Sequence, residues 1–341
     1  MRELNRALLA RQFLLERSSL PLLSTIERIG GLQTQYAPSG YIGLWSRTRN
    51  FGREALTTAL QQRRVMQGTL LRSTIHMVTA RDYWLFLAAI AQPRQAWWRR
   101  ITRTQFGDLD MEAAASALRE QLASGPRRAD ELKGVLRARG LPPVTWGGVA
   151  QWLHMVRVPP FGTLEQRRAN LYGLAETWIR PAHHPESAGL YVIRRYLGGF
   201  APASVREIAD WAGIPHAMLL PMLQRISLRH FRDEKGKELV DLPRAPLPVA
   251  ATPGSCPLLA NLGRYVAGAR PPHADSSRAL RPLVFNTRTP HSVPTFLVDG
   301  AVAGTWRFEG GRVELNPFEP IPRSAQREVD DEARRLAAFM R

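Results

Sequence analysis

A unit of three short helical segments followed by two strand-like segments recurs three times in the first 245 residues, and this repetition restricts the fold more than any other feature. In the middle unit the sequence predicts helices over 111–122, 129–140 and 145–157, and two strands around a basic turn within 158–175. Three helices and a two-stranded wing form the winged-helix variant of helix-turn-helix, whose last helix can enter a major groove. The pattern predicts a mainly α fold with three tandem winged-helix motifs.

The other two units follow the same order. In the middle unit, Val149, Trp152, Leu153 and Val156 are spaced so that the third helix packs one face on the core. In the last unit, Pro221 interrupts the expected third helix, where an interior proline costs about 3 kcal/mol, so a kink or a later start is expected. The expected elements are 5–16, 23–33, 39–49 and strand-like 65–79 in the first unit, and 189–199, 204–213, 215–227 and a hairpin at 228–242 in the last.

Capping residues predict where helices begin. Capping boxes are expected at 24–27 and 204–207, each followed by the apolar residues of a helix. Thr79 is expected to cap a further helix, which Pro93 should end because proline lacks the backbone N–H that a helix interior requires.

The pattern changes near Leu242. A proline-rich stretch is followed by short apolar runs separated by Asp-Gly, Ala-Gly and Gly-Gly, as in β-hairpins, and residues 323–341 form an amphipathic helix. The expected division is two winged-helix regions at 1–110 and 111–186, a third at 187–245, and a β-rich C-terminal subdomain with a terminal helix at 246–341.

The charge balance suggests a polyanionic partner. The 341 residues include 47 Lys and Arg against 29 Asp and Glu, which gives a net charge of +18 and makes nucleic acid the first candidate. The chain has no apolar run near the ~18 residues of a membrane helix, and its first residues form an amphipathic segment with Glu3 and Glu16 rather than a signal peptide. We expect no membrane partner and a cytoplasmic, nucleoid-associated location. The single cysteine, Cys256, excludes an internal disulfide.

Cofactor motifs are missing from the sequence. None of the 8 histidines has metal-ligand spacing, and the pair His183 and His184 lies in a proline-flanked stretch. The glycine-rich segment 30–40 lacks the Lys-Ser/Thr of a phosphate loop. We therefore expect neither a metal nor a cofactor.

The segment "GLQTQY" at 31–36 places two neutral amides in this basic chain. If the segment is extended, Gln33 and Gln35 lie on the same side, because side chains two apart share a face. Tyr36, Tyr41 and Arg47 follow at once, which suits a nucleic-acid surface. Trp45 is expected in the core rather than as a stacking platform.

Three segments, "GLQTQYAPSGYIGLWSR", "LLRSTIHMVTARDYW" and "FLVDGAVAGTWR", together resemble the AlkZ/YcaQ family of bacterial winged-helix DNA glycosylases. The resemblance implies three winged helices in a basic, C-shaped scaffold, and a catalytic Gln-x-Gln element on Gln33 and Gln35. Thr34 stands where the family usually has an aliphatic residue. The segment with His273, Asp275 and Arg278 is similar to the family's downstream segment. The resemblance also implies removal of N7-alkylated purines, including bulky adducts and interstrand crosslinks.

A glutamine pair is chemically adequate for such a substrate. An N7-alkylguanine is already cationic and leaves as a neutral base, so little acid catalysis is needed, and the amides need only position a water and face the developing sugar cation. We expect a monofunctional, monomeric enzyme on double-stranded DNA in which Arg47, Arg72, His76 and Arg307 fix phosphates. Arg72 and His76 have an alternative place in the core of a strand. Whether the base is flipped out is open.

Two other functions fit parts of the sequence. A non-enzymatic winged-helix DNA-binding protein, such as a transcription regulator, explains the charge and the fold, but assigns no purpose to Gln33 and Gln35. A protein that sequesters a toxic adduct leaves the basicity unexplained.

Overall fold

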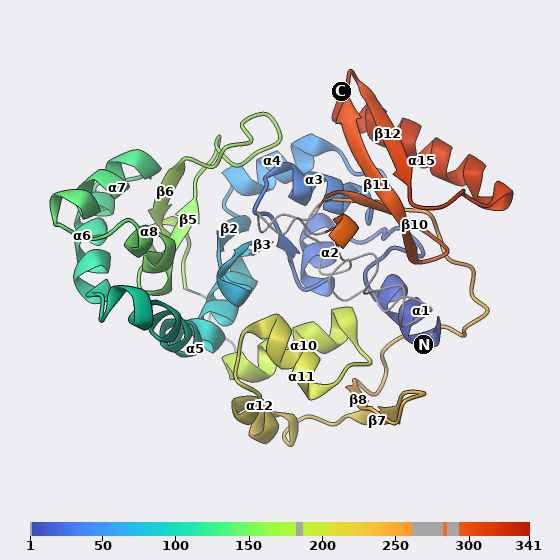
Figure 1. Cartoon of the computed structure of the whole chain (residues 1–341), viewed down its shortest axis with the longest axis horizontal. Helices are drawn as coiled ribbons and strands as arrows, with labels where there is room; N and C mark the ends of the chain where they lie inside the picture. Colours follow the sequence, from blue (N-terminus) through green and yellow to red (C-terminus); the bar gives the residue numbers. More distant parts are fainter. Residues whose placement is uncertain (1, 182–186, 261–281, 285–292) are drawn as a thin grey trace.

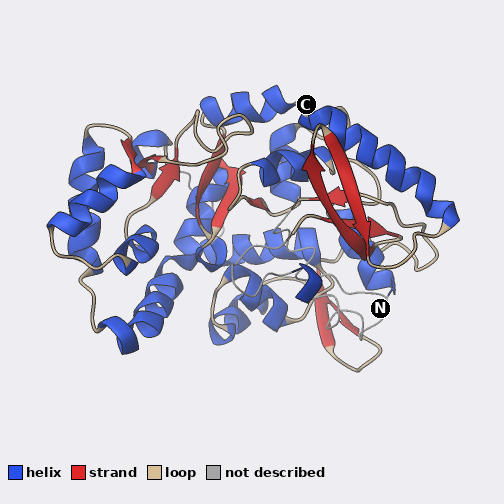
Figure 2. Ribbon diagram, turned by 45° about the horizontal axis from the view of Figure 1, so that its top comes forward, coloured by secondary structure: helices blue, strands red, loops and turns tan. Residues whose placement is uncertain are grey.

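The structure is a computed structural model that describes residues 2–181, 187–260, 282–284 and 293–341 (Figure 1). Helices surround short antiparallel strands (Figure 2), so the expected mainly α fold with a small β component is confirmed. Helices α6 (Met111–Ala123), α7 (Ala129–Ala138) and α8 (Val144–Gly148) form one end of the molecule (Figure 1). The other end is formed by the strands β10 (Thr295–Val298), β11 (Ala301–Glu309) and β12 (Arg312–Pro317) with helix α15 (Arg323–Met340). Beside the central strands lie α10 (Ala188–Phe200), α11 (Val205–Ala212) and α12 (His216–Leu223).

The N-terminal region differs from the prediction in the start of its second helix and in one additional helix. Its elements are α1 (Arg2–Arg11), α2 (Leu22–Arg28), β1 (Leu32–Gln33), α3 (Pro38–Trp45), α4 (Arg53–Gln61), β2 (Val65–Thr69), a 3-10 turn η1 (Leu71–Ser73) and β3 (Ile75–Thr79). The capping box expected at 24–27 is wrong, because Pro21 precedes the first helical residue and Ser24 lies inside α2. The sequence reasoning also missed α4.

Helix α5 (Ala80–Phe106) continues through the proline that was expected to end it. The cap at its start is confirmed, since the Thr79 side chain accepts a hydrogen bond from the Asp82 N–H. Beyond Pro93, the buried Arg94 guanidinium donates to Thr69 O at 2.9 Å and to the Gln151 side chain. These tertiary contacts hold the second half of α5 in place despite the local cost of the proline.

The middle region shows a second departure. It contains α6 (Met111–Ala123), β4 (Arg127–Arg128), α7 (Ala129–Ala138), α8 (Val144–Gly148), the 3-10 turn η2 (Val149–Gln151), β5 (Met155–Arg157), β6 (Leu171–Leu174) and α9 (Ala175–Trp178). The long third helix expected at 145–157 is wrong, and Val156 lies in a strand. The Trp98 ring packs so closely on Gly148 that a Cβ there would lie 2.1 Å from it, and this glycine weakens the helix.

The last helical region follows the prediction closely. It contains α10 (Ala188–Phe200), α11 (Val205–Ala212), α12 (His216–Leu223), β7 (Arg229–Arg232) and β8 (Glu238–Asp241). The capping box of Ser204 and Glu207 is confirmed at the start of α11, and the predicted hairpin is confirmed as β7–β8. Pro221 lies inside α12 without ending it.

Two sheets organise the remaining strands. One has the order β1-β3-β2-β5-β6-β4, so Gly68 of the N-terminal region pairs with Val156 of the middle region. The other has the order β12-β11-β10-β9 and is formed by β9 (Leu258–Leu259), β10 (Thr295–Val298), β11 (Ala301–Glu309) and β12 (Arg312–Pro317), with α15 (Arg323–Met340) packed on it. The turns expected at Asp-Gly (299–300) and Gly-Gly (310–311) and the terminal helix are confirmed. The turn expected at Ala-Gly is wrong, because Ala303 and Gly304 lie inside β11.

Candidate active site

The turn from α2 into β1 depends on two glycines. Gly30 and Gly31 have φ values of +75° and +79°, which favour glycine. A Cβ on Gly31 would lie 2.7 Å from Val78 Cγ1, so the chain approaches β3 too closely for a side chain. This approach places β1 against β3, with Gln33 directly opposite His76.

Gln33 is held by an arginine that connects two elements. Its amide oxygen accepts a hydrogen bond from Arg72 Nη2 at 3.4 Å, and Arg72 Nη1 donates to Trp211 O at 2.8 Å. Arg72 itself has a φ of 51° in the turn η1. The guanidinium therefore orients the Gln33 amide and fixes it relative to α11.

Gln35 lies beyond the end of β1 and is exposed to solvent. Its amide oxygen accepts a hydrogen bond from the backbone N–H of Ile75 at 3.2 Å. The segment from Arg72 to Ile75 therefore holds both glutamine side chains, which keeps the two amides close to the same turn.

Thr34 lies between them with its side chain directed into the protein. It is fully buried, and its Oγ1 has no hydrogen-bond partner among the described residues. Its backbone N–H donates to Ile75 O at 2.8 Å, and its carbonyl accepts from Arg157 Nη1 at 3.1 Å. An aliphatic side chain would suit this buried position equally well, because Thr34 Oγ1 makes no hydrogen bond to a described residue.

His76 is uncharged in this site. Only 3% of its surface is exposed, and burial, followed by the nearby Arg72 charge, lowers the pKa of His76 to about 3. Its Nδ1 lies 3.1 Å from Thr74 O, which places the proton on Nδ1 and leaves Nε2 as an acceptor. A neutral, buried imidazole offers a phosphate no charge, so the structure gives no support to the expected phosphate contact of His76.

A small pocket joins four of the predicted residues. Gln33, Arg47, Arg72 and His76 line a cavity of about 40 Å³. Arg47 is buried there and donates to Gly43 O at 2.9 Å. Since one water needs roughly 10–15 Å³ of this kind of volume, the pocket holds a few waters and is far too small for a purine. Among the described residues that line it, none is acidic.

The other predicted residues lie elsewhere. The contact of Tyr41 with DNA is wrong, because its side chain is fully buried and its hydroxyl is 2.8 Å from Thr57 Oγ1. Tyr36 is 38% exposed, near Gln35 in the chain, and accepts a hydrogen bond from Arg167. Arg307 is exposed on β11, paired with Glu314 at 2.6 Å, and does not line the pocket. Trp45 lies in the core as expected.

Sequence reasoning missed two residues that support this site. Arg157 binds the carbonyl of Thr34, and Trp211 accepts from Arg72 through its carbonyl. Both are far from the glutamines in sequence, and no local pattern relates them to the site. His273, Asp275 and Arg278, like His183 and His184, lie outside the described residues.

Among residues 2–181, 187–260, 282–284 and 293–341, no three His, Cys, Asp or Glu side chains group in a way that could hold a metal ion. No helix in the same ranges is both long and apolar enough to cross a membrane.

Comparison with known proteins identifies the family. Residues 26–339 match the profile of the family described as DNA glycosylase AlkZ-like. The chain belongs to the AlkZ-like DNA glycosylase family. An interstrand DNA cross-link repair glycosylase from Streptomyces sahachiroi is 21% identical over 359 residues, which cover 96% of this chain and 93% of that protein.

The structure of the DNA glycosylase AlkZ from Streptomyces sahachiroi has the same fold, with a TM-score of 0.80, 18% identity, and coverage of 100% of this chain and 97% of that one. The expected family is confirmed, and this AlkZ-like protein is a DNA glycosylase. The alternative of a non-enzymatic DNA-binding protein is thereby set aside.

Proposed function

We propose that this AlkZ-like glycosylase hydrolyses the N-glycosidic bond of cationic N7-alkylated purines in double-stranded DNA, with Gln33 and Gln35 as the catalytic pair. The observation that carries the proposal is the pocket beside Gln33, whose described lining contains no carboxylate. Among the described residues, this lining offers no strong general acid or base. It suits a substrate whose base is already a good leaving group, as a cationic purine is.

Each polar group has a distinct part in the proposed reaction. Arg72 and the Ile75 N–H fix the two glutamine amides, which then position a water against the anomeric carbon. The neutral His76 offers Nε2 as a further acceptor for that water, although a pKa of about 3, lowered by burial, makes it too weak a base to deprotonate it. Arg47 is buried and contributes its charge to the site without direct contact, while the half-buried Arg72 is proposed to attract a phosphate beside the lesion. That phosphate also faces the sugar as it becomes positive.

The wider organisation proposed for DNA binding follows the helix–hairpin units. We assign α2–α4 with β2–β3, α6–α8 with β5–β6, and α10–α12 with β7–β8 as three winged helices around a C-shaped basic surface. Tyr36 and the exposed Arg307 are candidates to touch the DNA backbone. The enzyme is proposed to act as a monomer near the nucleoid in the cytoplasm.

Crosslinked purines are a second candidate substrate, because the Streptomyces relative is named a cross-link repair glycosylase. A base tethered to the opposite strand cannot turn into a closed pocket. The cavity beside Gln33, at about 40 Å³, is too small to hold a base, so the proposed reaction takes place with the base outside it. This supports a role in base excision repair or in self-resistance to a DNA-alkylating compound.

The decisive experiment is single-turnover release of 7-methylguanine from methylated duplex DNA. We expect the variant Gln33→Ala/Gln35→Ala to release the base at least ~100-fold more slowly than the wild type, because it loses the groups that position the water. Gln62→Ala, an exposed glutamine at the end of α4, is the matched control and should react at the wild-type rate. Undiminished release by the double variant would sink the catalytic assignment.

The same chemistry predicts lesion selectivity. Uracil and 1,N6-ethenoadenine are neutral and leave poorly without an acid, so we expect their release to be at least ~100-fold slower than that of 7-methylguanine. Parallel single-turnover assays on duplexes with one lesion each make the comparison. Efficient uracil release would show that the site contains an acid that the glutamine scheme lacks.

A further inference from the structure

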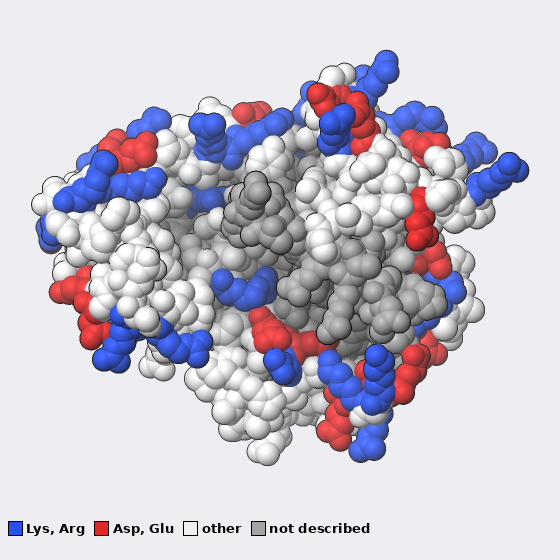
Figure 3. All heavy atoms as spheres, viewed as in Figure 1, with Lys and Arg blue, Asp and Glu red and all other residues white. Residues whose placement is uncertain are grey.

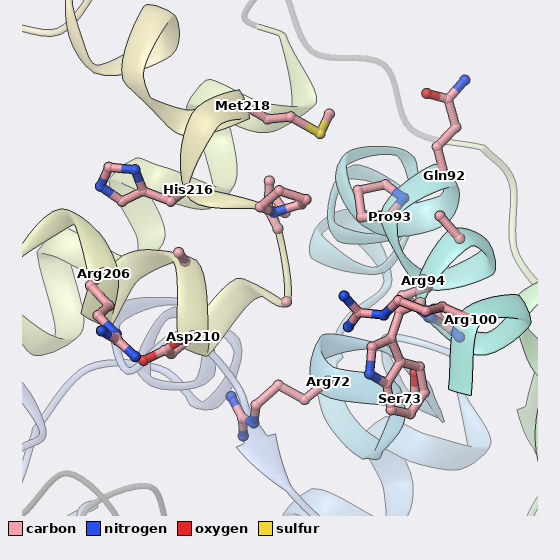
Figure 4. A pocket seen from close by; sticks show the side chains of 16 residues that line it. Arg72, Ser73, Gln92, Pro93, Arg94, Arg100, Arg206, Asp210, His216 and Met218 are labelled. Carbon is pink, nitrogen blue, oxygen red and sulfur yellow. The ribbon is translucent and has the colours of Figure 1, made fainter. Parts of the chain in front are cut away.

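A second, much larger hollow lies between α5 and the α11–α12 pair. Its volume is about 1010 Å³, just above the upper end of the range of roughly 300–1,000 Å³ in which small-molecule sites occur. Figure 4 shows Arg206, His216 and Met218 on one side, with Arg94 and Arg100 across from them and Arg72 nearby. We call this hollow the α5–α12 cleft.

The walls of the α5–α12 cleft carry exposed apolar surface. Trp97 on α5 is 39% exposed, and Met218 on α12 is 41% exposed. Ala96 and Pro215 extend this surface. A large aromatic ring left partly bare in a hollow is a platform on which another flat ring can stack.

Positive charge accompanies the apolar walls. Arg100 and Arg206 are exposed on opposite walls, whereas Arg94 is buried and bound to Gln151, so it adds charge without being available for contact. Asp210 is the acidic residue among the described lining. The cleft therefore combines cations that suit a phosphate with a ring that suits a base.

The α5–α12 cleft adjoins the glutamine pocket. Arg72 lines both cavities, and no other described residue does. Its guanidinium holds Gln33, while its backbone faces the cleft beside Gly213, where a Cβ would lie 3.4 Å from Arg72 N. A group in the cleft is thus separated from the catalytic amide by one arginine side chain.

We propose that the α5–α12 cleft binds one nucleotide that has left the base stack beside the lesion, with its base on Trp97 and its phosphate between Arg100 and Arg206. This inference deepens, and rests on, the proposed function, since it places DNA at Gln33. The small pocket has no room for a base, but the cleft has. A nucleotide has a base that can stack on the aromatic lining and a phosphate that can pair with the cationic lining. An apolar adduct would use only the aromatic lining.

The test uses undamaged DNA, so it does not depend on glycosylase activity. Fluorescence anisotropy compares the affinity of the full chain for a fully paired duplex and for the same duplex with one unpaired 2-aminopurine nucleotide. We expect the wild type to prefer the unpaired nucleotide by about tenfold, since stacking contributes about 1–3 kcal/mol per base. The indole should also quench the emission of the bound 2-aminopurine.

Four variants separate stacking from general effects. Trp97→Ala should abolish the preference and the quenching, Trp97→Phe should retain most of the preference, and Arg206→Ala should reduce it. Phe106→Ala removes an equally exposed ring, also 39%, from the same helix outside the cleft and should change neither readout.

Equal wild-type affinity for both duplexes would overturn the proposal, as would an undiminished preference in Trp97→Ala. Preferential binding of a paired duplex that carries a bulky aromatic N7 substituent, without any preference for the unpaired nucleotide, would overturn it as well and assign the cleft to the adduct. Slow release of 7-methylguanine by the wild type would count against the proposed function alone.

Discussion

Gln33 and His76 face each other across β1 and β3, and both are uncharged at neutral pH. The positive charge of the site lies instead on Arg47 and Arg72, which line the same pocket. A charged imidazole there would add a third cation beside the buried Arg47 and the half-buried Arg72, which burial and the neighbouring guanidinium both disfavour. In the proposed mechanism, the arginines therefore attract phosphate, and the uncharged glutamines position the water.

The pKa of His76 predicts how stability depends on pH. Burial lowers this pKa to about 3, against about 6.5 in an unfolded chain. Between these values the unfolded state binds more protons, so the stabilisation is complete above about pH 6.5 and is lost as the pH falls towards 3, by about 1.4 kcal/mol per unit. From pH 7 to pH 5, we expect urea unfolding to show the wild type losing about 2 kcal/mol more than His76→Gln.

His154, whose pKa is also lowered by burial, contributes in the same direction in both proteins and cancels from this difference. Equal losses in wild type and variant would mean that the imidazole is accessible to protons in the native state. A phosphate contact would then regain support.

At the scale of elements, the continuity of α5 across Pro93 depends on Arg94. This guanidinium binds Thr69 O at the end of β2, and Ala150 O and the Gln151 side chain in the turn η2. Burial lowers its pKa to about 10, so it stays charged at neutral pH. The contacts connect α5 to β2 of the six-stranded sheet and to η2 of the middle region.

We expect Arg94→Met to lower the free energy of unfolding by about 3 kcal/mol or more, because it leaves several buried carbonyl oxygens without donors. Arg103→Met is the control on the same helix. Its guanidinium is 75% exposed and lies 3.6 Å from Asp108, so its loss should cost less than about 1 kcal/mol. Chemical denaturation of both variants measures the difference, and equal costs would contradict the role given to Arg94.

Local signals predicted the elements whose ends are set locally. Ser204 and Glu207 cap α11 because both partners lie in one turn, and the hairpin β7–β8 needs only its own glycine turn. The helix start predicted at Ser24 was wrong, because the helix begins directly after Pro21. The helix end predicted at Pro93 was wrong, because contacts with distant residues outweigh the local cost of the proline. The sequence indicates which residues favour the start or end of a helix, but not which tertiary contacts override that local preference.

The same limit applies to the site. Gln33, Arg47, Arg72 and His76 were chosen from the sequence, and the fold brings them around one pocket. Proximity to the glutamines in sequence does not predict the burial of Tyr41, because every residue of α3 is buried by neighbouring elements. The charge of His76 was also beyond the sequence, since it depends on burial by several elements.

At the scale of the whole molecule, the six-stranded sheet connects regions that the sequence pattern separates. Gly68 and Val156 pair across it, so the N-terminal and middle helix–hairpin units share one sheet. Basic side chains occur at both ends of the face in Figure 3 and within the hollow between them. A rigid connection of this kind holds several basic surfaces in a fixed relation to one DNA duplex.

The net charge of +18 predicts strongly salt-dependent binding that is nearly independent of sequence. If about six to ten phosphates are contacted, affinity for undamaged duplexes should fall by about 10³ to 10⁵ between about 50 and 200 mM salt. Arg168, exposed in the loop between β5 and β6, should contribute one contact, so Arg168→Gln is expected to reduce the slope by about 1. Arg119 is already paired with Glu176 at 2.9 Å, and Arg119→Gln should leave the slope unchanged. Anisotropy titrations on two unrelated sequences measure both effects. A shallow slope with strong preference for one sequence would mean that base contacts, rather than the backbone, dominate the interface.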